Sequence, residues 1–271
     1  MCFSPARLQF QRELQQPDEQ IDLARAALYI AAAEYLALDP DPYLAILDRM
    51  AATVAPRLPS ERYPLKVIQT LNAYFYEELG FRGNADHYYD PRNSFLNDVL
   101  DRRTGIPITL ALVYLEITRR LGFPMVGIGM PGHFLIRPDF PEAGIYVDAF
   151  HQGEVLFEAD CADLLSRLYQ QPVTLQPQFL RPVTRRQLLA RLLTNLKLIY
   201  INRNELEHAL AIVEHLLIAT PDNAVERRDR GLLHYQLGNL SPAIADLEAY
   251  LQARPEARDA DAIEQLLTRL R

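Results

Sequence analysis

Cysteine is scarce in this chain of 271 residues, since only Cys2 and Cys161 are present, and tryptophan is absent. Two cysteines are too few for the disulfide framework of a small secreted domain. No cysteine–histidine spacing matches that of a zinc site. We therefore expect no bound metal, and no motif in the chain calls for a cofactor.

A surplus of positive charge is also missing, because the formal net charge is −7. Binding to nucleic acid depends on Lys and Arg that neutralise phosphates, so we expect no nucleic-acid partner. No apolar run reaches the roughly 18 residues of a membrane span, and the first residues carry no secretion signal. We expect a cytoplasmic protein that has no membrane partner.

Apolar residues recur at helical spacing through the first 80 residues. The pattern predicts two helices within residues 18–55, the second capped by Asp41 with Pro42 at its first position. A third helix is expected over residues 64–79, and Gly80 ends it.

The composition changes after this helical part. Residues 81–105 are polar, aromatic and rich in turn residues, with Asn93 or Ser94 expected to cap a short helix over 95–102. A largely buried helix follows over 106–121. Strands are then predicted within 125–137, 145–150 and 153–157, and a helix over 159–170.

The last third of the chain repeats itself with a period of 34 residues, which is the spacing of a tetratricopeptide array. The matched pairs are Tyr200 and His234, Ala209 and Ala243, and Pro221 and Pro255. Proline-rich residues 172–182 read as a linker. We therefore predict an N-terminal extension (1–17), an α+β domain (18–171), the linker, and an all-α repeat domain (183–271) with a capping helix.

Residues 104–150 have the layout of a thiol enzyme: a turn that opens a helix, then His133 and Asp148 on two strands expected to be neighbours. Such an enzyme places a cysteine at the helix start, where the helix dipole stabilises the thiolate. A histidine moves the proton and a carboxylate orients the imidazole. His133 and Asp148 are the right residue types for these two roles.

Three longer strings make the pattern more specific. They are residues 89–94, 103–109 and 131–134. Together with the 34-residue repeats, they resemble the bacterial SirB-type family, in which a transglutaminase-like domain precedes tetratricopeptide repeats. The resemblance covers about residues 20–270 and implies a transglutaminase-like (papain-like) fold. It also implies a regulatory or scaffold role, without an established substrate.

The chain departs from the active transglutaminase-like enzymes at the nucleophile. Alignment on Leu121 and Gly122 puts Pro107 or, with a small shift, Thr109 at the place of the cysteine. A proline cannot act as a nucleophile, and a threonine hydroxyl needs a strongly placed base. Cys161, at the start of the helix expected over 159–170, is an alternative nucleophile, and an N-terminal Cys2 is another.

The polar stretch over residues 87–97 has two interpretations. Tyr89, Arg92, Asn93 and Asn97 are candidates for lining a ligand cleft beside His133. Alternatively, such turn residues tie down an irregular loop through hydrogen bonds.

Three functional hypotheses follow. In the first, the protein is a non-catalytic regulatory or scaffold module that binds a protein partner through its repeats. In the second, it is a hydrolase or acyltransferase of the amidase or peptidase type, which uses Thr109 or Cys161 with His133 and Asp148. In the third, the N-terminal domain only supports the repeats, and residues 183–271 alone retain partner binding.

Overall fold

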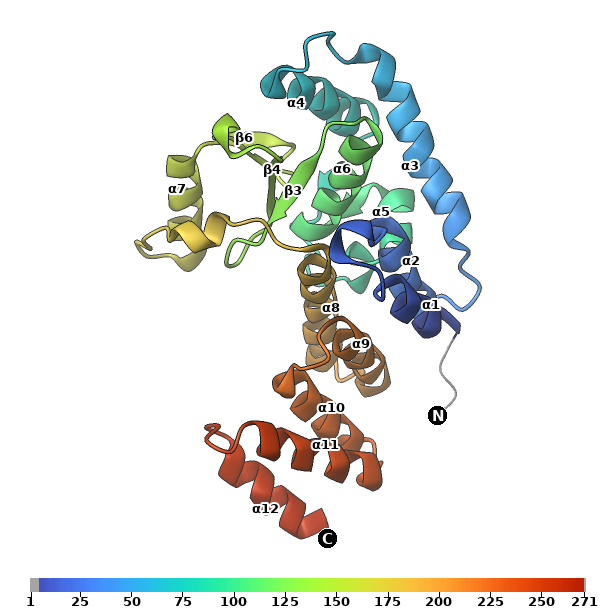
Figure 1. Ribbon diagram of the computed structural model, residues 1–271, viewed down its shortest axis with the longest axis vertical. Helices are drawn as coiled ribbons and strands as arrows, with labels where there is room; N and C mark the ends of the chain where they lie inside the picture. The colour runs from blue at the N-terminus through green and yellow to red at the C-terminus, as the bar shows by residue number, and fades with distance from the viewer. Residues whose placement is uncertain (1–4, 271) are drawn as a thin grey trace.

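The computed structural model describes residues 5–270, and helices form its N-terminal part (Figure 1). These elements are α1 (Pro5–Glu13), η1 (Asp18–Gln20), α2 (Leu23–Glu34), α3 (Pro40–Val54), η2 (Ala55–Arg57), α4 (Pro64–Asn72) and the π-helical turn η3 (Ala73–Glu78). Residues 5–13 of the predicted N-terminal extension are therefore helical. They pack onto the rest of the chain through Phe10, whose ring lies 5.2 Å from that of His215.

The start of α3 differs from the sequence prediction. Asp39, rather than Asp41, is the N-cap, and its side chain accepts the backbone N–H of Asp41. Pro40 is then the first helical residue, and Pro42 still fits in the first turn. That turn has no intrahelical partner for its N–H groups, so a proline there removes no bond.

One long helix and one small sheet form the centre of the first part. Here β1 (Arg82–Gly83) pairs in parallel with β2 (Thr104–Gly105), and η4 (Pro91–Asn93) and α5 (Leu96–Arg102) lie between them in the chain. The predicted caps Asn93 and Ser94 are wrong, because Phe95 is the N-cap of α5 and makes no side-chain bond there. The next helix, α6 (Pro107–Arg120), is buried along almost its whole length.

The antiparallel sheet has the order β3-β4-β5-β6. Its strands are β3 (Met125–Ile128), β4 (Leu135–Pro138), β5 (Tyr146–Asp148) and β6 (Glu154–Leu156), with the turn η5 (Pro141–Ala143) before β5. The helix α7 (Glu158–Tyr169) packs on this sheet through a small apolar cluster that contains Ile128, Leu135 and Cys161. The predicted linker, with η6 (Pro177–Leu180), packs partly against the same cluster.

Five helices follow between residues 185 and 270 and confirm the predicted helical repeats. They are α8 (Arg185–Asn202), α9 (Leu206–Ala219), α10 (Ala224–Gln236), α11 (Leu240–Ala253) and α12 (Ala260–Leu270). The repeat alanines Ala209 and Ala243 are fully buried, as expected where two helices of a pair touch. No helix within residues 5–270 is long and apolar enough to cross a membrane.

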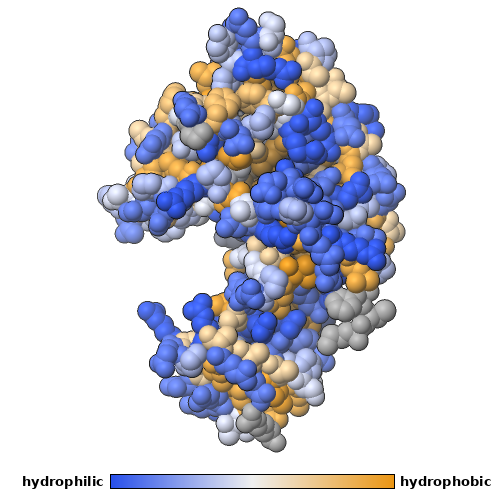
Figure 2. All heavy atoms as spheres, viewed as in Figure 1, coloured by the Kyte–Doolittle hydropathy of each residue, from blue (hydrophilic) through white to orange (hydrophobic). Residues whose placement is uncertain are grey.

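The first repeat pair is not a separate body. Leu189 and Leu193 of α8 and Leu216 of α9 belong to the same apolar core as α2 and α6. Only the end of the array, around Leu247 and Ile263, has an apolar cluster of its own. The repeats extend downward from the first part in Figure 1, and the surface is hollowed between the α7 lobe and the last helices (Figure 2).

Candidate functional site

His133 and Asp148 meet in the structure. His133 follows Gly132, whose φ of +75° turns the loop before β4, and Asp148 is the last residue of β5. These two strands pair in antiparallel register, which brings the residues together. His133 Nε2 lies 2.7 Å from Asp148 Oδ2, and both side chains are buried. The carboxylate therefore holds one nitrogen of the imidazole, which fixes the position of the ring.

The Asp148 carboxylate is held from two sides. Its Oδ1 accepts the backbone N–H groups of Phe150 and His151 at 2.9 and 3.2 Å, and its Oδ2 faces both imidazoles. Burial acts to raise the pKa of Asp148, but its hydrogen bonds and charge interactions with His133 and His151 outweigh that effect. The net result is a pKa below the ordinary value.

His151 is a site residue that the sequence reasoning missed. Its Nδ1 lies 2.8 Å from Asp148 Oδ2, and its ring stacks on that of His133 with centroids 5.8 Å apart. His133 and Asp148 are almost fully enclosed, whereas the His151 side chain is 53% exposed. The sequence signal was present as an Asp-x-x-His spacing followed by Gly153, a pattern in which a turn brings both side chains together.

The turn that carries His151 is pinned from α4. Gly153, with φ of +73°, donates its N–H to the Asp148 carbonyl at 2.9 Å. Its own carbonyl accepts Nδ2 of Asn72 at 2.7 Å. A Cβ at Gly153 would lie 2.2 Å from Asn72 Oδ1, so this close approach requires glycine. Asn72 in turn accepts the hydroxyl of Tyr114 from α6.

Arg191 of α8 ties the His133 loop to the first repeat helix. Its guanidinium donates to the carbonyl of Met130 at 2.9 Å and to that of His133, and it lies over the ring of Phe134. Burial lowers the pKa of Arg191. A side chain of the repeat part therefore helps to fix the position of His133.

The Thr109 side chain has a structural role at the start of α6. It lies in the first turn of α6, is 1% exposed, and its hydroxyl donates to the carbonyl of Asn93 at 2.7 Å. The same oxygen accepts the backbone N–H of Ile106 at 3.1 Å. Thr109 thus satisfies a buried backbone group at the helix start and ties α6 to the loop before α5.

Cys161 lies in the apolar cluster between α7 and the sheet and is fully buried. Burial, reinforced by the neighbouring Asp160 and Glu158, raises the pKa of the thiol to about 12. Among residues 5–270, no hydrogen bond joins Thr109 or Cys161 to His133. Cys2 lies outside the described residues.

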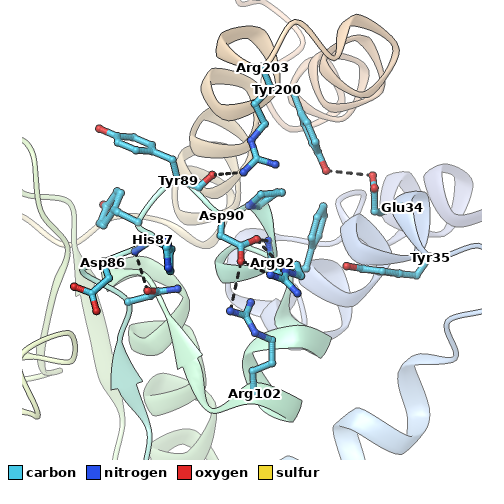
Figure 3. A pocket seen from close by; sticks show the side chains of 14 residues that line it. Glu34, Tyr35, Asp86, His87, Tyr89, Asp90, Arg92, Arg102, Tyr200 and Arg203 are labelled. Atoms are coloured by element: carbon cyan, nitrogen blue, oxygen red, sulfur yellow. Dashed lines mark hydrogen bonds and ion pairs between the residues drawn. The ribbon is translucent and has the colours of Figure 1, made fainter.

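The irregular loop before α5 borders a cavity of about 730 Å³ (Figure 3). Tyr89 and Arg92, both predicted cleft residues, line it. Arg92 and Arg102 turn toward Asp90, and Arg203, the residue just after α8, reaches the carbonyl of Tyr89. The cavity therefore lies between the first part and the repeats, with most of its charges already paired.

The other two predicted cleft residues lie elsewhere. Asn93 is fully buried, and its Nδ2 donates to the carbonyls of His87 and Tyr88. It ties down the loop, as the alternative interpretation proposed. Asn97 is 5% exposed and lines a neighbouring cavity of about 710 Å³.

Comparisons with known proteins agree with this architecture. Residues 41–194 match the transglutaminase-like superfamily, and residues 196–268 match the tetratricopeptide repeat. The chain is similar to a UPF0162 protein of Xylella fastidiosa, with 37% identity over 257 residues, 91% of this chain and 89% of that protein. A UPF0162 protein of Pseudomonas aeruginosa is 33% identical over 229 residues, 84% of this chain and 83% of that protein. The human F-box only protein 21 is 38% identical over 110 residues, 38% of this chain and 18% of that protein.

Proposed function

The chain belongs to the transglutaminase-like superfamily and to the UPF0162 proteins, and we propose that it is a non-catalytic regulatory or scaffold module that binds a protein partner. The SirB-type assignment suggested by its motifs is part of the same proposal.

The start of α6 is the observation that carries this proposal. In a transglutaminase-like enzyme this helix start supplies the thiolate, whereas here it carries Pro107, followed two residues later by Thr109. The Thr109 hydroxyl already serves two buried backbone groups. The bond between His133 and Asp148 remains, but a histidine–carboxylate pair without a nucleophile cannot form an acyl-enzyme.

The repeat helices offer the surface for a partner. Large apolar side chains project from the first helix of each pair: Leu198 and Ile201 on α8 are 51% and 40% exposed, and Val225 and Tyr235 on α10 are 38% and 41% exposed. Tetratricopeptide arrays bind other proteins along extended faces of this kind. Aromatic and aliphatic anchors contribute most of the binding energy in such contacts.

The shared core supports a binding unit that includes both parts of the chain. Leu188, Leu189, Leu192 and Leu193 of α8 pack into the core of the first part. Cutting the chain before residue 183 would expose this apolar face, so the repeats are best tested in the full chain. This consideration weighs against the expectation that residues 183–271 alone retain partner binding.

The binding test uses the full chain as bait for proteins of its source cells. A specific partner should be captured by the wild type and lost by Leu198→Asp and Tyr235→Asp. Leu36→Asp is the matched control, because Leu36 is 92% exposed but lies outside the repeats. If both repeat variants retain every partner that the wild type captures, the repeat surface is not the binding site and the proposal fails.

The competing hydrolase or acyltransferase hypothesis draws support from the preserved bond between His133 and Asp148. It is tested by incubating the full chain with a panel of activated esters and amides. We expect no turnover above that of a folded control protein. Turnover that His133→Ala abolishes, together with its loss in Thr109→Val or Cys161→Ala, would overturn the non-catalytic proposal.

A further inference from the structure

Three side chains that can each bind a metal ion converge at the end of β5. The ligand atoms His133 Nε2, Asp148 Oδ2 and His151 Nδ1 all lie within 4.8 Å of one another. Each nitrogen is already close to the same carboxylate oxygen, at 2.7 and 2.8 Å. The ligand atoms of a tetrahedral zinc site stand about 3.3 Å apart, so each imidazole nitrogen would move about half an ångström away from the carboxylate oxygen to admit an ion.

We infer that His133, Asp148 and His151 form a binding site for one divalent transition-metal ion, with Zn²⁺ as the best-matched ion. This inference goes beyond the proposed function and does not depend on it. It also differs from the prediction of no bound metal, which rested on cysteine–histidine spacings. The ligand set here is two imidazoles and one carboxylate, drawn from a loop, a strand end and a turn.

The donor set favours this class of metal. Imidazole nitrogens suit zinc, copper, nickel and iron, whereas Mg²⁺ and Ca²⁺ prefer sites made of oxygens. Three protein ligands leave a further coordination position open for water or for a group from outside. The exposure of the His151 side chain gives that position access to solvent, while His133 and Asp148 are enclosed.

The residues behind the three ligands hold them in place. Two backbone N–H groups fix Oδ1 of Asp148, which leaves Oδ2 for the ion. Asn72 pins the turn that carries His151, and Arg191 holds the carbonyl of His133. Such outer contacts orient the ligands of protein metal sites and strengthen binding. A buried carboxylate also benefits from a nearby positive charge.

The alternative is a cluster held by hydrogen bonds alone, in which each neutral imidazole donates an N–H to Asp148. His151→Gln separates the two possibilities, because glutamine can still donate to the carboxylate but supplies no imidazole ligand. His151→Ala removes both contacts. Both substitutions are at a half-exposed position, where the fold tolerates change.

The experiment strips the full chain of metal with a chelator and titrates it with ZnCl₂ in a calorimeter. We expect one ion per chain, and at least tenfold weaker binding in both His151→Ala and His151→Gln. His208→Ala is the matched control, because His208 is similarly exposed at 48% but lies on α9, away from the cluster. It should bind Zn²⁺ as the wild type does.

A thermal melt gives an independent measure. Saturating Zn²⁺ should raise the unfolding temperature of the wild type and of His208→Ala, and should raise that of the two His151 variants by clearly less. No stoichiometric binding by the wild type, or equal affinity in the wild type and His151→Gln, would show a hydrogen-bonded cluster only and overturn the inference. Failure of partner capture through the repeats would leave this result untouched, so the two proposals fail separately.

Discussion

Replacing Thr109 by valine removes one hydroxyl from the first turn of α6 and keeps the shape of the side chain. The hydroxyl donates to the Asn93 carbonyl at 2.7 Å and accepts the Ile106 N–H at 3.1 Å. Both partners are buried, with Asn93 at 0% and Ile106 at 1% exposure. Water therefore cannot replace the lost bonds, and two polar groups are left unsatisfied.

The expected loss of stability follows from these two unsatisfied groups. A buried group that loses its partner costs about 1–3 kcal/mol, so the loss of two partners in Thr109→Val should lower the free energy of unfolding by about 2–6 kcal/mol. Thr109→Ser keeps the hydroxyl and loses only a buried methyl group, which costs about 1 kcal/mol. The hydroxyl, rather than the volume of the side chain, should decide the outcome.

The assay is urea denaturation of the full chain, followed by circular dichroism, with the midpoint compared at unchanged slope. Thr53→Val is the control, because Thr53 is exposed and its hydroxyl bonds only within its own helix. That variant should change stability by less than about 0.5 kcal/mol. If Thr109→Val is as stable as Thr109→Ser, the hydroxyl has no structural role, and its candidacy as a nucleophile is restored.

Three further predictions test the other buried groups. The Cys161 thiol, with a pKa raised to about 12, should resist iodoacetamide in the native protein, as read by mass spectrometry; rapid native labelling would contradict its inert role. Burial lowers the pKa of His215, so the unfolded chain takes up the proton first, and the free energy of unfolding should fall as the pH drops through about 6.5. His215→Gln should make this decrease with pH smaller. An unchanged pH dependence in the variant would show that His215 is not its source. Lys197→Met should cost about 3–5 kcal/mol of unfolding free energy, because Glu226 and Asp229 lose their shared cation; a neutral result would show the cluster to be dispensable.

Local patterns were sufficient for the repeats and for most of the helices. The 34-residue period placed Ala209 and Ala243 at buried helix contacts, because each repeat unit buries the same face against its neighbour. The starts of α3 and α5 were harder to predict. Asp39 and Asp41 both precede a proline and offer the same capping signal, and Asn93 binds carbonyls of the loop just before it instead of capping α5.

The residues of the candidate site were also predictable from the sequence only in part. His133 and Asp148 were found from the sequence because their motifs and strand positions are local features. Thr109 and Cys161 were only candidates, since hydroxyl and thiol chemistry depends on burial and neighbours that no spacing reveals. Asn97 and Tyr89 are close in the chain, yet they line different cavities.

The sequence by itself determined the class of fold, the order of its two parts and the absence of a cysteine at the start of α6. These follow from residue identity and from periodicity along one chain. Only the tertiary structure decided that His151 joins His133 and Asp148, that Arg191 of the repeats holds the His133 loop, and that the Cys161 thiol lies in an apolar cluster. Such contacts arise when segments far apart in the chain pack together. They are stabilised by burial and hydrogen bonding, which the spacing of residues along the chain does not reveal.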